Sequence, residues 1–281
     1  MTTARSDRRG VSGRAPRASV IAAAVLLGGA ALVGPRAVGA PVGDDAPPFD
    51  VGEKLAYEVR YVGLHCGDMT LETFRGDDAD YRIVMTARTT PFFDRIHKVR
   101  MRLESWFDPD SGSSIRYRET SFEKDVTSVK EYLLDLEKGT VTELEHGEVS
   151  ETFEISVRPV HDPLAFIFRA RELLGVDGTP VVLNLIGSGK AAPVRVEIVD
   201  RKTTSTPSGR QPADIAVPRT TDQLLFSRKG EMEMWLSVDE RRIPYRIEFD
   251  LAFGSLQAKL ASVATRPPTE TDADRAPTFD E

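Results

Sequence analysis

Alternation of apolar and polar residues with a period of two is the feature that most limits the fold of this chain. Between Lys54 and Val62 every second side chain is apolar, and those between them are charged or small. Such alternation is typical of a strand that buries one face. The apolar positions there are Leu55, Tyr57, Val59 and Tyr61. Further strands are predicted at Asp68–Phe74, Tyr81–Thr89, Lys98–Phe107, Ser114–Phe122, Ser128–Leu136 and Thr140–Glu145.

Short runs rich in Gly, Asp and Pro separate these strands, as at Gly76-Asp77-Asp78 and Lys138-Gly139. Turn residues of this kind reverse the chain within a few positions. Because parallel strands need long crossover connections, the spacing predicts an antiparallel meander. We expect no helix between residues 40 and 139. Later strands are predicted at Pro180–Ile186, Val194–Lys202, Asp214–Val217, Leu224–Ser227, Glu231–Ser237, Tyr245–Phe253 and Leu256–Ala264.

One helix is predicted, at about residues 162–174. Asp162 can accept hydrogen bonds from the first free amides, and Pro163 suits the first helical position. Gly175 is expected to end the helix in a left-handed conformation. The apolar residues cover more than one stripe of the helix, so we expect it to be buried. These residues are Leu164, Ala165, Phe166, Ile167, Phe168, Leu173 and Leu174.

The fold class predicted from these elements is mostly β. We expect an antiparallel sheet, curved into a half or nearly closed barrel, with the helix packed into or across it. The domain spans residues 49–265, a size that a single all-β domain can reach. Residues 266–281 are rich in Pro, Thr and acidic residues, which predicts a disordered tail.

The N-terminal residues have the charge order of a secretory signal. Five arginines precede an uncharged, mostly apolar run from Ala18 to Val33. This run is short for a membrane-spanning helix, which needs about 20 residues. Residues 1–39 are therefore interpreted as a cleaved signal peptide, and 40–48 as a linker. We expect a periplasmic protein, exported by the general secretory route or, given Arg8-Arg9, by the twin-arginine route.

Charge limits the classes of partner. Without residues 1–40 the chain has 31 basic and 43 acidic residues, a formal net charge of −12. Nucleic acid and anionic lipid headgroups require a basic surface, so this balance argues against both. Cys66 is the only cysteine, so no disulfide forms within the chain. The expected partners are an apolar ligand or an envelope protein, with no retained transmembrane helix.

Few residues offer a reaction centre. His65 and Cys66 are neighbours on a predicted strand, so their side chains point to opposite faces, and Cys66 is interpreted as a small buried thiol. His161 could act as a base oriented by Asp162, but Asp162 is better explained as the helix cap. Gly187-Ser188-Gly189-Lys190 lacks the first glycine of a phosphate loop and is interpreted as a turn. The histidine spacing is not typical of zinc sites, so we predict no catalytic residue, metal or cofactor.

Large apolar side chains are the remaining candidates for a site. They would form ordinary core or line a cavity between the curved sheet and the helix, where Met and aromatic side chains can adapt to an acyl chain. A curved sheet leaves such a space unless strand number and tilt are matched. The candidate lining residues are Tyr57, Tyr61, Phe92, Phe93, Met101, Trp106, Phe166 and Trp235.

Several short motifs occur in an order that resembles a known family. They are Phe49-Asp50-Val51-Gly52-Glu53-Lys54-Leu55, Val62-Gly63-Leu64-His65-Cys66-Gly67-Asp68, Asp162-Pro163-Leu164 leading to Arg169, and Leu236-Ser237-Val238-Asp239-Glu240-Arg241-Arg242-Ile243-Pro244. Over residues 49–262 the chain resembles the exported bacterial β-rich proteins of domain of unknown function 3108. The resemblance implies an architecture similar to periplasmic half-barrels that carry lipids or lipoproteins. From its residue types alone, the run Asp239-Glu240-Arg241-Arg242 is interpreted as a solvated hairpin turn with charged tips, the alternative being a docking edge for a partner protein.

Three functions are compatible with these observations. The favoured one is a non-enzymatic periplasmic binding module for a lipid or another apolar component of the cell envelope. The alternative is a structural or interaction protein that joins an envelope complex through a free sheet edge. The third is a hydrolase or isomerase whose carboxylates cannot be singled out among the many acidic residues.

Overall fold

The computed structural model describes residues 51–75, 81–123, 125–175, 177–187, 189–220, 232–251 and 254–265. The expected leader, linker and tail lie outside these residues, as does the strand expected at Leu224–Ser227. The described residues contain fifteen strands, all in one sheet, and two helices. Among them, no helix is long and apolar enough to cross a membrane.

The strands follow the predicted alternation closely. In the first half they are β1 (Glu53–Tyr61), β2 (Leu64–Arg75), β3 (Tyr81–Thr89), β4 (Val99–Asp108), β5 (Ser113–Glu123), β6 (Val126–Asp135), β7 (Thr140–Glu145) and β8 (Glu148–Glu154). In the second half they are β9 (Val160–His161), β10 (Val181–Gly187), β11 (Lys190–Thr206), β12 (Gly209–Arg219), β13 (Met232–Ser237), β14 (Pro244–Leu251) and β15 (Gly254–Thr265). Strands β8 and β9 were not expected from the sequence.

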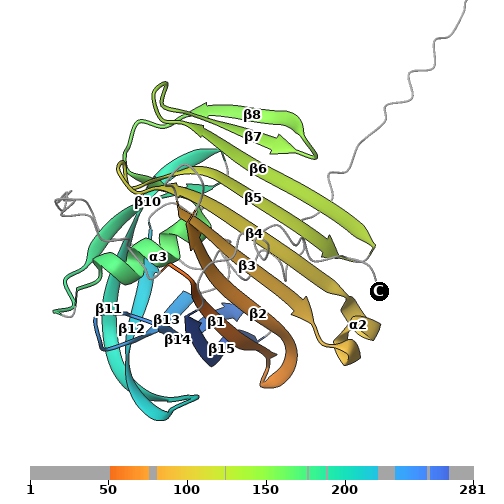
Figure 1. The fold of residues 1–281 in the computed structure, drawn as a ribbon, viewed down its shortest axis with the longest axis vertical. Coiled ribbons are helices and arrows are strands. Elements are labelled where there is room, and N and C mark those ends of the chain that lie inside the picture. The colour runs from red at the N-terminus through yellow and green to blue at the C-terminus, as the bar shows by residue number, and fades with distance from the viewer. Residues whose placement is uncertain are drawn as a thin grey trace, which may run out of the picture.

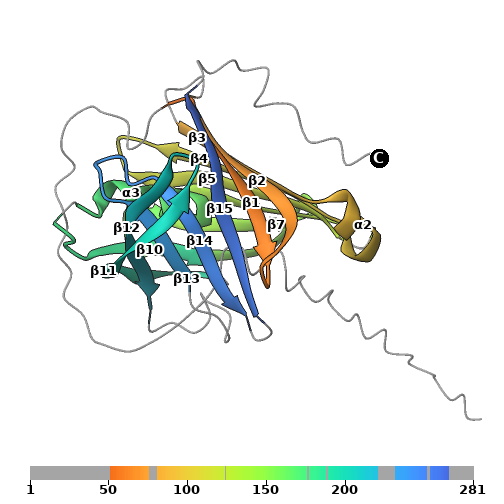
Figure 2. The ribbon, with the colours of Figure 1, turned by 90° about the horizontal axis from the view of Figure 1, so that it is seen from below.

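Two meanders make the sheet. Strands β1 to β8 pair in chain order, strands β10 to β15 do the same, and β1 pairs with β15 to join the two series. Every pair is antiparallel except β9 with β10. The sheet curves around an interior without closing, because β8 and β9 remain its two ends (Figures 1 and 2). The predicted fold, a mostly β half or nearly closed barrel, is confirmed.

The expectation of no helix between residues 40 and 139 is wrong. Helix α2 (Pro91–His97) connects β3 to β4. Thr90 is extended and Pro91 stands in the first turn, as the start of a helix requires. The helix has seven residues and buries none of them. Seven residues make only about two turns, too few for the repeated apolar stripe by which helices are recognised in a sequence.

The second helix, α3 (Pro163–Leu173), lies on the concave side of the sheet, where it contacts β3, β4, β9 and β10 (Figure 1). It begins as predicted. The Asp162 carboxylate accepts hydrogen bonds from the backbone amides of Leu164, at 2.8 Å, and Ala165, at 3.1 Å. The hydroxyls of Ser105 on β4 and Ser114 on β5 donate to the other carboxylate oxygen at 2.5 and 2.6 Å. The cap thus also ties the helix to two strands.

The end of α3 differs from the prediction. Gly175 does not adopt the left-handed conformation; instead, the Arg242 guanidinium donates to the carbonyls of Leu174 and Gly175 at 3.1 and 2.6 Å. Arg242 is 1% exposed and pairs with Asp214 at 2.5 Å, so the charged run at 239–242 is not wholly solvated. A guanidinium has five donors in a fixed fork, which allows it to satisfy a carboxylate and several carbonyls together.

Candidate functional site

An apolar cavity of about 80 Å³ lies between α3 and the concave face of the sheet. Its lining comes from β1, β2, β3, β4, β14 and β15, together with Ile167 of α3. Strands from both meanders therefore contribute to one space. The apolar residues that line it include Val59, Met69, Leu71, Met85, Val99, Met101, Ile247, Phe249 and Leu256.

The register of the sheet explains which side chains meet in the cavity. Met69 on β2 pairs with Ala87 on β3, and Ala87 pairs with Met101 on β4. Residues in register on neighbouring strands point to the same face. The cavity wall therefore has a row of Met, Ala and Met across three strands. Because methionine is unbranched and flexible, this wall can change shape without moving the backbone.

Small residues leave the space open. Ala87 on β3 and Ala258 on β15 line the cavity, and each stands between larger side chains on the adjacent strands. Gly67 on β2 has a different role: a Cβ there would lie 2.5 Å from the carbonyl oxygen of Arg88. This close approach of β2 to β3 excludes every residue except glycine.

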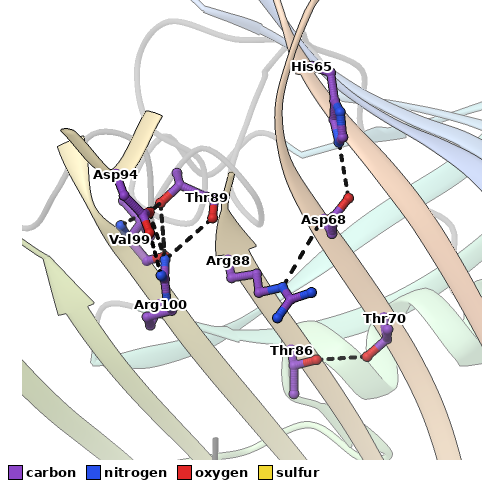
Figure 3. A network of polar contacts seen from close by, with 9 residues as sticks. All are labelled: His65, Asp68, Thr70, Thr86, Arg88, Thr89, Asp94, Val99 and Arg100. Atoms are coloured by element: carbon purple, nitrogen blue, oxygen red, sulfur yellow. Dashed lines mark hydrogen bonds and ion pairs between the residues drawn. The ribbon is translucent and has the colours of Figure 1, made fainter. Parts of the chain in front are cut away.

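Cys66 lies at the cavity wall and is half-buried. Its thiol donates to the carbonyl of Val59 at 3.5 Å, and partial burial raises its pKa, so the neutral thiol is favoured. The His65 ring bonds to the carboxylate of Asp68 at 3.0 Å (Figure 3). Cys66 and His65 thus have separate partners, as expected of neighbours on a strand.

Three of the predicted lining residues lie in the main core. Met101 lines the cavity and is 2% exposed. Tyr57 and Phe166 are also buried in this core but do not line the cavity. The Tyr57 hydroxyl donates to the carbonyl of Pro244 at 3.0 Å, and burial raises its pKa, so it is a neutral hydrogen-bond donor.

The other five predicted residues lie elsewhere. Trp106 is stacked between the guanidinium groups of Arg82 and Arg116, at 5.2 and 4.7 Å from the ring centre. Trp235 belongs to a separate small cluster on the other face of β13 and lies 4.4 Å from the guanidinium of Arg246. The remaining three, Tyr61, Phe92 and Phe93, lie near the end of the sheet where α2 is found.

Polar contacts hold α2 beside the cavity. Asp94 of the helix pairs with Arg100 of β4 at 2.6 Å and accepts from the Thr89 hydroxyl at 2.5 Å (Figure 3). The hydrogen bond from Arg100 lowers the pKa of Asp94, and the hydrogen bond from Thr89 lowers it further, whereas burial acts to raise it. The amide of Thr90 also donates to the carbonyl of Cys66 at 2.9 Å. Since Cys66 and Thr89 line the cavity, α2 lies directly beside it.

His161 is the most unusual titratable residue of the described chain. It is fully buried, and neither ring nitrogen has a hydrogen-bond partner among the described residues. Burial, with a smaller contribution from the charge of Arg169, lowers its pKa to about 3. The ring is therefore neutral at neutral pH. Its neighbour Asp162 is engaged as the cap of α3, and the described residues contain no group of three possible metal ligands.

A family model described as "Protein of unknown function (DUF3108)" matches residues 56–261. The chain belongs to this family. The predicted resemblance is confirmed, and the match includes both helices and all of the cavity lining. A comparison with curated proteins gives no match.

One solved structure shows a similar architecture. A Brucella abortus protein, described as a beta-barrel-like protein of domain of unknown function DUF1849, is 12% identical, with a TM-score of 0.53. The likeness covers 78% of this chain and 99% of that protein. A Bacteroides fragilis protein described as exported, with a YmcC-like fold, is 10% identical with a TM-score of 0.28, over 77% of this chain and 97% of its own. The Brucella structure supports the barrel-like fold alone.

Proposed function

We propose that this protein is a non-enzymatic binding module for a lipid or another apolar component of the cell envelope. The observation that carries this proposal is the cavity between α3 and the sheet. Its wall is almost wholly apolar, and it lies within the core cluster of the domain. Pockets for small molecules are typically concave and lined by apolar side chains, with few polar groups.

The size of the cavity limits the kind of ligand. At about 80 Å³ it is smaller than the ~150 Å³ of an engineered cavity that takes up benzene. Without rearrangement it therefore accepts only the end of a hydrocarbon chain. Met69, Met85 and Met101 are the side chains whose movement would enlarge it, because each has three rotatable bonds. We infer a ligand with a flexible acyl or similar chain rather than a rigid, bulky one.

Export is part of the proposal. The leader at residues 1–39 supports a periplasmic location, and the acidic balance of the remaining chain supports a ligand that is bound through its apolar part. An apolar compound leaves water for the cavity at a gain of roughly 25 cal/mol for each Å² that is buried. No charged group of the protein is required for this gain.

The alternative, attachment to a complex through a sheet edge, receives less support from the edge strands. β8 is an exposed edge strand of seven residues, and three of them are glutamates: Glu148, Glu151 and Glu154. Charged side chains on an edge oppose pairing with another strand. The other end of the sheet, β9, has two residues, both buried.

The test combines ligand content with stability. Native mass spectrometry of the gently purified protein should show a bound apolar compound, and Met101→Glu should abolish it while the protein stays folded. A buried, unpaired carboxylate is strongly unfavourable beside hydrocarbon, but at the cavity wall it can hydrate. Leu103→Glu is the matched control. Leu103 lies two residues further along β4, is 0% exposed and does not line the cavity, so this change should unfold the protein.

Two results would contradict the proposal. One is a wild-type protein that carries no apolar compound from its native envelope. The other is equal unfolding of Met101→Glu and Leu103→Glu, because both positions would then belong to solid core.

A further inference from the structure

Exposed apolar side chains gather at one end of the sheet. Val62 and Leu64, in and after the β1–β2 turn, are 61% and 65% exposed. Phe92 and Ile96 on α2 are 66% and 69% exposed, and Val126 at the start of β6 is 60% exposed. We name these five residues the apolar rim. Single exposed apolar residues are ordinary, but a group of them marks an interaction site.

Strand register places the rim at one end. The β1–β2 turn closes the pair formed by Tyr61 and Leu64. The pair of Gly67 with Thr89 brings the end of β3, and with it α2, to the same level of the sheet. At the next strands, Val99 pairs with Glu123, which pairs with Val126. Figures 1 and 2 show α2 and the β1–β2 turn at this end of the molecule.

The cavity reaches the surface at the same end. Its lining includes Cys66, Ala87 and Thr89, which are only partly buried, whereas the strand residues Met69, Met85 and Met101 deeper in the wall are buried. Thr89 is followed directly by the residues of α2, and Cys66 lies two positions after Leu64. The rim is thus continuous with the wall of the cavity.

The fold itself does not require the apolar side chains of α2. None of the seven residues of the helix is buried. Its connection to the sheet is polar, through Asp94, Arg100 and Thr89 (Figure 3). A helix of this length is marginal in water without tertiary contacts. Phe92 and Ile96 are therefore presented to the outside by a helix that is held in place by other residues.

Building on the proposed function, we propose that the apolar rim inserts into the surface of a phospholipid bilayer and brings the cavity to the lipid. Two cationic side chains lie beside the rim apolar residues of α2: Arg95, which is exposed, and Lys98, which is half-exposed. Arg88 lies at the same end, 4.0 Å from the carboxylate of Asp68. Outside the leader the chain has a net charge of −12, so most of its surface repels phosphate groups, whereas cations at this end attract them. Insertion of apolar side chains supplies the main attraction, and the cations set the orientation.

The experiment measures vesicle binding by flotation. The vesicles contain four parts phosphatidylethanolamine and one part phosphatidylglycerol. The test variant is Phe92→Ser/Ile96→Ser, and the control is Val182→Ser/Val199→Ser, which changes side chains that are 44% and 46% exposed on β10 and β11. All proteins share the same N-terminal residues, so any retained leader contributes equally to each.

We expect the test variant to bind vesicles at least about tenfold more weakly than the wild type, and the control to bind as strongly as the wild type. Native mass spectra of the same samples should show unchanged cavity ligand in both variants, because neither change touches the cavity wall. Vesicle binding by a wild type that lacks a cavity ligand would support the docking surface and contradict the proposed function.

Three results would overturn the docking proposal. The first is a wild type that does not float with vesicles. The second is a test variant that floats as well as the wild type. The third is a control variant that loses as much vesicle binding as the test variant. A different result would assign the rim to a protein partner: the wild type copurifies with one protein in a fixed ratio and does not bind vesicles, and Phe92→Ser/Ile96→Ser loses that protein.

Discussion

A larger side chain at a position that lines the cavity tests most directly whether free space exists there. Ala258 on β15 lines the cavity between Val59 on β1 and Ile247 on β14, and is 8% exposed. Ala258→Leu adds three carbon atoms, whose burial is worth up to about 2.4 kcal/mol at ~0.8 kcal/mol per methylene. Steric adjustment will reduce this gain. We expect unfolding free energy to rise by about 1–2 kcal/mol, or roughly 2–8 °C in Tm.

The control places the same change in solid core. Ala216 on β12 is 0% exposed and belongs to the same core cluster, but does not line the cavity. Ala216→Leu should overpack this site and lower the unfolding free energy by about 1–3 kcal/mol. Urea unfolding of delipidated samples gives both values, because bound ligand would itself stabilise the wild type.

Ligand content completes the test. If the cavity holds an acyl chain, Ala258→Leu should remove the ligand from native mass spectra while the protein becomes more stable. Equal destabilisation by Ala258→Leu and Ala216→Leu would refute the reasoning, because it would mean that no free space exists beside Ala258.

Three further predictions concern the buried polar groups and the thiol. His161→Leu should flatten the acid dependence of stability. The unfolded histidine takes up a proton below pH ~6.5 but the folded one only near pH 3, so within that window this residue alone lowers the unfolding free energy by about 1.4 kcal/mol for each unit that the pH falls, a contribution that urea titrations at several pH values measure as the difference between wild type and variant. Arg242→Met should cost about 3–5 kcal/mol, because three carbonyls lose this donor and Asp214 keeps only Arg201 as its described cationic partner. Arg241→Met, on a side chain 43% exposed, should cost under about 1 kcal/mol. Cys66→Ala should cost on the order of 1 kcal/mol and leave ligand content unchanged; rapid thiol labelling together with ligand loss would contradict this.

The strands could be predicted because the alternation of apolar and polar residues along each strand indicates which of its faces is buried. In the first half of β1 the residues at every second position, Glu53, Leu55 and Tyr57, are buried, and a single sequence can show such alternation without any homologue. Helix α3 was equally visible through Asp162, Pro163 and its apolar residues. Helix α2 was not, because its seven residues make only about two turns, too few for a repeated apolar stripe. The role of Arg242 was also hidden, since its carboxylate partner is 28 residues away in the sequence.

The cavity could be predicted only in outline. Its place depends on which side chains the register brings together, and on Ala87 and Ala258 being small where their neighbours are large. The odd or even spacing of residues along a strand could have removed some residues from the predicted cavity lining. Trp106 is an odd number of residues from Met101, and a strand then turns the two side chains to opposite faces.

The cavity persists because α3 is held at both ends by buried polar groups. At the N-terminal end, Asp162 binds the hydroxyls of β4 and β5. At the C-terminal end, Arg171 forms a bidentate pair with Glu53 of β1 at 2.8 and 3.1 Å, and Arg242 holds the last carbonyls. Removal of Glu53 would leave the buried Arg171 guanidinium without this carboxylate partner, which is costly in the core. The helix is therefore not free to settle onto the sheet. Under the proposed function, we expect a ligand to enter at the apolar rim, where α2 is attached to β4 by the partly exposed pair of Asp94 with Arg100.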